Sequence, residues 1–100
     1  MLIEQTVLNN RNNSIVIQIQ AGKTIINPTQ LTKVQLLVGT TLFDNITNPQ
    51  YFNLTLPDRF IFNLGTAGLA TGRYLSKIYG FDTVNVLGIE FGEFYINISA

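Results

Sequence analysis

Short runs of alternating apolar and polar residues recur along this chain, separated by glycine, proline, asparagine and aspartate. The clearest run spans residues 14–20, where Ile15, Ile17 and Ile19 share one face of an extended segment. Helical periodicity is nearly absent. This pattern predicts half-buried β-strands rather than helices.

The same reading predicts about seven strands in total, with turn signals every ~8–12 residues. Such spacing is typical of an all-β fold, and we predict an immunoglobulin-like antiparallel β-sandwich. The chain is short enough for one domain spanning 1–100, with 1–8 as an N-terminal arm or an edge strand. Besides 14–20, the predicted strands cover 2–8, 32–40, 51–56, 59–64, 73–81 and 87–98.

Two local features refine this prediction. The asparagine-rich stretch 9–13 has turn chemistry, which predicts a hairpin between 2–8 and 14–20. Gly88 and Gly92 interrupt the last strand and predict a bulge or a bend there.

Charge is scarce in this composition. Charged residues make up 12% of the chain, against roughly 25% in ordinary soluble domains. Six bases balance six acids, so little long-range repulsion keeps neighbouring molecules apart. The composition favours a protein in contact with others, although abundant asparagine, glutamine and threonine would also hydrate an uncharged surface.

The sequence has no features that indicate nucleic acid or membrane partners. The lysines and arginines are scattered singly, so no basic patch for nucleic acid is predicted. No window has the ~18 apolar residues of a membrane span, and residues 1–6 lack the pattern of a signal peptide. The absence of cysteine leaves the redox compartment open.

Catalytic chemistry is also poorly represented. Without histidine and cysteine, the commonest general base, metal ligand and thiol nucleophile are missing. Glu90 and Glu93 would face opposite sides of a strand unless Gly92 bulges the backbone. We therefore predict a non-enzymatic protein with no catalytic residue, metal site or cofactor.

A glycan-binding module for host-surface attachment is the alternative from another functional class. Tyrosine presents an apolar face with a polar tip and can stack on sugars. The candidates are Tyr51, Tyr74, Tyr79 and Tyr95.

Three spaced motifs in the second half carry a resemblance. Gly-x-Tyr at 72–74 is followed by Tyr-x-x-Asp at 79–82 and Asn-x-x-Gly-Ile at 85–89. With the segments around them, from about 15 to 98, they resemble small immunoglobulin-like domains of tailed-bacteriophage virions. The resemblance implies a non-enzymatic domain that decorates the capsid, sits at the head–tail junction or belongs to the baseplate.

The chain has nothing after its last predicted strand that could form a stalk or a receptor-binding tip, which favours a free-standing accessory subunit. A capsid-decorating cement protein is the first expectation, with a head–tail or tail-associated component as the alternative. The expected partners are other virion proteins, first the major capsid protein, with self-association left open and no nucleic acid or membrane. The expected location is the virion, assembled in the host cytoplasm.

Contact through a sheet edge is the expected mechanism. An edge strand has unpaired backbone groups that can add to a neighbour's sheet. The predicted edges are the N-terminal segment 2–8 or the C-terminal segment 94–98. The candidate interface residues are Leu2, Ile3, Val7, Phe94, Ile96 and Ile98.

Overall fold

The computed structural model describes residues 3–100, apart from the side chain of Ala21. Strands account for 48% of the chain and short 3-10 turns for 6%, which confirms the all-β prediction. The two 3-10 turns are η1 (Pro28–Gln30) and η2 (Pro49–Tyr51). The strands are β1 (Glu4–Leu8), β2 (Ile15–Ile17), β3 (Gln20–Ala21), β4 (Thr24–Ile25), β5 (Lys33–Val38), β6 (Thr41–Asp44), β7 (Phe52–Asn53), β8 (Phe60–Phe62), β9 (Gly72–Phe81) and β10 (Ile89–Ser99).

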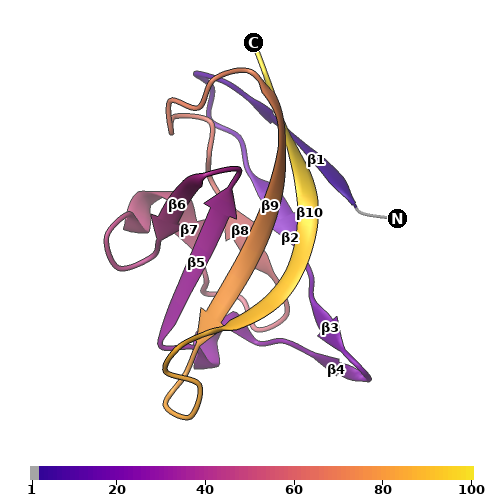
Figure 1. Cartoon of the computed structure of the whole chain (residues 1–100), viewed down its shortest axis with the longest axis vertical. Coiled ribbons are helices and arrows are strands. Elements are labelled where there is room, and N and C mark those ends of the chain that lie inside the picture. The colour runs from indigo at the N-terminus through magenta and orange to yellow at the C-terminus, as the bar shows by residue number, and fades with distance from the viewer. Residues whose placement is uncertain (1–2) are drawn as a thin grey trace.

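The strands form two main sheets (Figure 1). The larger sheet has the order β1-β10-β9-β5-β6, the smaller has the order β2-β8-β7, and β3 and β4 form a separate hairpin. All pairings are antiparallel except that of β1 with β10, which is parallel. The prediction of an antiparallel fold was therefore wrong for β1. No helix in the described part of the chain is long and apolar enough to cross a membrane.

The predicted hairpin between the first two strands does not form. β1 belongs to the larger sheet and β2 to the smaller one. The asparagine-rich connection does turn sharply, with Asn10 at a φ of 61°. However, it crosses from one sheet to the other, because β1 finds its backbone partners on β10 at the far end of the chain.

Both main sheets contribute side chains to a single apolar core. The alternation predicted for 14–20 is confirmed in β2, where Ile15 and Ile17 are 2% and 7% exposed and Val16 is 46% exposed. The larger sheet follows the same rule, with every second residue of β5 buried. The largest fully buried side chains include Phe60, Phe62, Ile15, Leu36, Leu64, Ile78 and Ile96.

The predicted irregularity in the last strand is present as a bulge. The register of β10 against β9 shifts between Glu90 and Gly92. The extra residue, Phe91, packs over Gly80 and lies with its ring centroid 6.4 Å from that of Phe60. The bulge thus supplies a partly buried side chain that packs against the core.

Candidate interaction site

The two glutamates considered as a carboxylate pair lie on the outer face of the larger sheet. The bulge brings both there, with Glu90 opposite Tyr79 and Glu93 opposite Lys77. The Lys77 ammonium lies 3.3 Å from a Glu90 carboxylate oxygen. The hydrogen bond that Lys77 donates to the Glu90 carboxylate raises the pKa of Lys77. Glu90 is therefore in an ion pair, and the described residues contain no cluster of acidic side chains that could hold a metal ion.

The four tyrosines do not form a shared stacking surface. The Tyr74 hydroxyl donates to the Ala70 carbonyl at 2.7 Å. The Arg73 guanidinium covers the ring of Tyr95 at 3.8 Å from its centroid. Tyr51 packs edge-on against Phe43. Three of the four candidate tyrosines are therefore engaged in contacts within the chain, and one ring face of Tyr95 is covered.

The structure corrects the predicted interface residues. Val7, Phe94, Ile96 and Ile98 are at most 4% exposed and belong to the core. Their positions in the alternation turn these side chains toward the smaller sheet, so a partner cannot reach them without opening the fold. Ile3 is 60% exposed and remains available for contact. Leu2 lies outside the described residues.

Of the two predicted sheet edges, the structure retains the N-terminal one. From Tyr95 to Ile98, β10 has β1 on one side and β9 on the other, so this part of β10 is internal. β1 is an edge strand. The prediction of a free edge at the C-terminal segment 94–98 is therefore wrong, because β1 pairs with most of this segment.

An asparagine closes part of the β1 edge. The Leu8 amide donates to Asn13 Oδ1 at 3.1 Å, and Asn13 Nδ2 donates to the Leu8 carbonyl at 2.8 Å. A single side-chain amide thus pairs with both backbone groups of Leu8, as a further strand would do. Among the described residues, the backbone groups that remain unpaired at this edge of β1 lie N-terminal to Leu8.

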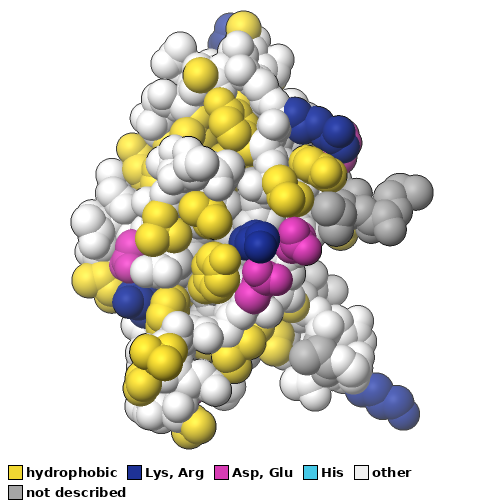
Figure 2. Space-filling model, viewed as in Figure 1, with side chains coloured by type: hydrophobic (Ala, Val, Ile, Leu, Met, Phe, Trp, Pro, Cys, Tyr) yellow, Lys and Arg dark blue, Asp and Glu magenta, His cyan; other side chains and the backbone are white. Residues whose placement is uncertain are grey.

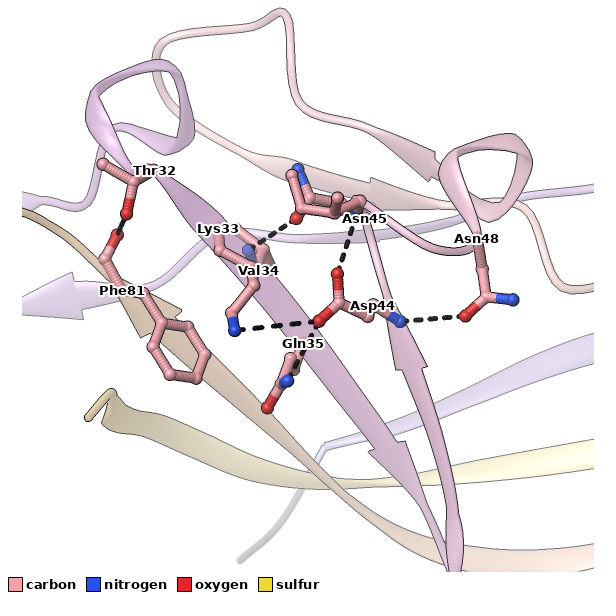
Figure 3. A network of polar contacts seen from close by, with 9 residues as sticks. Thr32, Lys33, Val34, Gln35, Asp44, Asn45, Asn48 and Phe81 are labelled. Carbon is pink, nitrogen blue, oxygen red and sulfur yellow. Dashed lines mark hydrogen bonds and ion pairs between the residues drawn. The ribbon is translucent and has the colours of Figure 1, made fainter. Parts of the chain in front are cut away.

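The opposite edge of the same sheet has a similar closure (Figure 3). On β6, the Asp44 amide donates to Asn48 Oδ1 at 3.2 Å, and the Asn48 amide donates to the Asp44 carbonyl at 2.6 Å. Burial raises the pKa of the Asp44 carboxyl, but hydrogen bonds from Gln35 and Ile46 outweigh it and lower the pKa. Asparagine here does what lysine, proline or a bulge does on many sheet edges.

The most exposed apolar side chains are on the loop between β9 and β10. Val84, Val86 and Leu87 are 85%, 69% and 94% exposed. Figure 2 shows hydrophobic side chains at the end of the molecule where Figure 1 places this loop. The sequence analysis did not single out these residues: it placed Leu87 in the predicted strand 87–98, whereas β10 begins at Ile89, and apolar residues in a loop follow no strand or helix period.

The loop is held in shape by Asp82. Its Oδ1 accepts hydrogen bonds from the amides of Val84 at 2.9 Å and Asn85 at 2.6 Å. Gly88 closes the loop with a φ of 91°, a conformation that favours glycine. The three exposed side chains therefore extend from an ordered support. We refer to Val84, Val86 and Leu87 together as the apolar tip.

Acidification is expected to loosen this loop. Hydrogen bonds from the Asn85 amide and side chain lower the pKa of Asp82. A carboxyl whose pKa is lowered by folding stabilises the fold above its unfolded pKa, and this contribution is lost as the pH falls through the folded pKa. Amide hydrogen exchange at Val84 and Asn85, corrected for intrinsic rates, should therefore accelerate below the ordinary aspartate range. An Asp82→Asn chain should lack this pH dependence, and the same acceleration in both chains would contradict the assignment.

A comparison with known protein families, with curated proteins and with solved structures finds no match to this chain.

Proposed function

We propose that the chain is a non-enzymatic structural subunit of a bacteriophage virion with an immunoglobulin-like β-sandwich fold. Its proposed role is that of an accessory capsid-decorating, or cement, protein that binds other capsid proteins. A head–tail or tail-associated position uses the same contacts and is the alternative placement.

The strand order supports the fold part of this proposal. In immunoglobulin-like domains, strands C, F and G share one sheet, and B, E and D share the other. Assigning these letters to β5, β9, β10, β2, β8 and β7 reproduces both groups, and β6 then extends the first sheet beside strand C.

A tyrosine contact also supports the fold. Immunoglobulin-like domains have a tyrosine near the start of strand F whose hydroxyl bonds to the backbone a few residues upstream. Tyr74 is near the start of β9, and its hydroxyl donates to the carbonyl of Ala70. This contact ties the connection before β9 to the sheet.

The apolar tip is the observation that carries the functional part. Fully burying one aliphatic side chain of this size is worth roughly 1.5–3 kcal/mol. Val84, Val86 and Leu87 forgo most of this stabilisation in the isolated chain, although Asp82 holds their loop in place. An ordered loop with three exposed aliphatic side chains is suited to a lasting contact with another protein.

The test is incorporation into particles. In a chain with Val84→Thr, Val86→Thr and Leu87→Gln, the amount that copurifies with gradient-purified virions should fall by about tenfold or more. The fold should persist, because these side chains lie outside the core. Electron microscopy of the unaltered particles would then distinguish a capsid from a tail position.

A matched control changes three exposed aliphatic residues elsewhere. Val16, Ile46 and Leu56 are 46%, 66% and 38% exposed, so Val16→Thr, Ile46→Thr and Leu56→Gln make the same kind of change at exposed aliphatic side chains away from the apolar tip. This control chain should be incorporated normally. Absence of the unaltered chain from particles would overturn the proposed function, and equal incorporation of all three chains would exclude the apolar tip as the contact.

A further inference from the structure

The segment 15–21 has partner strands along one side only. β2 pairs with β8, the Ile19 carbonyl accepts from the Ile26 amide at 2.9 Å, and β3 pairs with β4. Among the described residues, no strand lies on the other side of β2 or β3. Figure 1 shows β2 leading into the β3–β4 hairpin. The segment is therefore one continuous sheet edge.

The backbone groups of Val16 face the open side of this edge. In an antiparallel ladder, alternate residues direct both backbone groups to the same neighbour. The Asn63 amide donates to the Tyr51 carbonyl at 2.8 Å, on the β7 side of β8. The preceding residue, Phe62, therefore faces β2, where it pairs with Ile15. Val16 follows Ile15, so its amide and carbonyl are directed away from β8.

The part of the chain that lies level with Val16 in the larger sheet is β1. At one end of this stretch the Asn13 side chain bonds to Leu8, and at the other Ile3 and Gln18 line the same hollow. Val16 lies between these two points. β1 pairs with β10, and no hydrogen bond joins the described residues of β1 to Val16. The described structure therefore leaves the edge open at Val16.

This edge lacks the closure found on β1 and β6. There, Asn13 and Asn48 pair with backbone groups of the edge strand, whereas other proteins use lysine, proline or a bulge. The segment 12–22 contains no charged residue and no proline, and the pairing of β2 with β8 has no register shift. The Val16 side chain is also exposed. An unprotected, uncharged edge is suited to pairing with a further strand.

We infer that this edge is a contact between two copies of the chain, with β2 of one copy antiparallel to β2 of the other across a two-fold axis at Val16. The Val16 amide of each copy donates to the Val16 carbonyl of the other. The two smaller sheets thereby join into one. This contact goes beyond the proposed function, which concerns binding to other capsid proteins, and it does not depend on that function.

The pattern along the edge is self-complementary, which favours a second copy over a different protein. A two-fold contact brings the same patch of both subunits together. With the axis at Val16, Ser14 lies opposite Gln18 of the other copy. All three side chains are exposed, whereas Ile15 and Ile17 between them are buried. The axis thus joins valine to valine and polar to polar side chains, and it places no like charges opposite each other.

The test is sedimentation equilibrium of the purified chain over a concentration series. The unaltered chain should show a monomer–dimer equilibrium. Val16→Lys should raise the dissociation constant about fivefold or more, because it places two ammonium groups opposite each other across the axis. Val16→Thr is the matched control, since it keeps the branched side chain and the amide and adds no charge. It should dimerise as the unaltered chain does.

Charge complementation tests the two-fold arrangement itself. Val16→Glu alone should also weaken the dimer, because two carboxylates then face each other. An equimolar mixture of Val16→Lys and Val16→Glu chains should form a dimer at least about fivefold tighter than that of either chain alone, because a cross-strand ion pair replaces the repulsion. This rescue requires position 16 of one copy to lie opposite position 16 of the other. Amide spectra should verify that both variants fold.

Three results would overturn the contact: a monomer at every concentration, a dimer that Val16→Lys leaves unchanged, or a mixture no tighter than its components. If the charged variants failed to fold, amide exchange in the unaltered chain would decide. The Val16 amide should exchange at least about tenfold more slowly in concentrated than in dilute solution. Equal exchange at both concentrations would also overturn the contact.

The apolar-tip variant separates this inference from the proposed function. The chain with Val84→Thr, Val86→Thr and Leu87→Gln leaves β2 unaltered, so it should dimerise as the unaltered chain does. Loss of the dimer in this variant would assign self-association to the apolar tip and overturn the contact at Val16. Incorporation is measured in particles and dimerisation on the purified chain, so either can fail while the other stands.

Discussion

Replacing Phe60 with alanine is expected to lower the free energy of unfolding by about 3–5 kcal/mol. Phe60 is fully buried on β8, the central strand of the smaller sheet. Its ring stacks against Phe62 at 6.3 Å between centroids and contacts Phe91 of the larger sheet. Removing the Phe60 ring eliminates this contact between the two sheets and leaves a cavity in the core. Since domains of this size are stable by roughly 5–15 kcal/mol, a large share of the stability is at stake.

Urea denaturation followed by far-ultraviolet circular dichroism would measure this loss. Val16→Ala is the control, because Val16 is on the neighbouring strand β2 and faces solvent. Its cost should stay near the roughly 0.5 kcal/mol typical of surface substitutions. Equal costs for the two variants would show that Phe60 does not anchor the core.

Introducing a methyl group at Gly65 is expected to be similarly severe. A Cβ on Gly65 would lie 1.7 Å from the Arg11 carbonyl oxygen and 2.6 Å from Asn13 Nδ2. The Gly65 carbonyl also accepts from the Asn10 amide at 2.7 Å. The methyl group would displace the connection that carries the chain from β1 to β2. The cost of Gly65→Ala should reach or exceed the upper end of the roughly 1–3 kcal/mol seen for overpacked sites.

Gly92→Ala is the control that tests whether the loss of stability in Gly65→Ala comes from the close approach of the Arg11 carbonyl to Gly65. A Cβ on Gly92 would meet no atom within 4 Å, and its φ is not positive. Gly92→Ala should therefore leave the melting temperature almost unchanged, whereas Gly65→Ala should lower it by about 10 °C or more. A small effect at Gly65 would mean that the connection between β1 and β2 moves aside at little cost.

The predicted and observed surfaces differ for a physical reason. The sequence suggested Phe94, Ile96 and Ile98 as contacts because a terminal strand was expected at a free edge. In the structure, β1 covers that edge and the smaller sheet covers these side chains. The apolar tip, in contrast, was not predicted as a contact, since nothing local distinguishes an exposed valine from a buried one in a loop.

The sequence by itself determined the all-β class, a bulge or a bend at the glycines of the last strand, and the absence of histidine and cysteine chemistry, because alternation, glycine conformation and side-chain reactivity are local properties. It did not predict the short strands β3, β4 and β6. Only the tertiary structure decided that β1 pairs in parallel with β10 and that Asn13 and Asn48 close two sheet edges. These features depend on residues far apart in the chain. A period of two specifies which side chains share a face, but it leaves the choice of neighbouring strand to packing and backbone pairing across the whole fold.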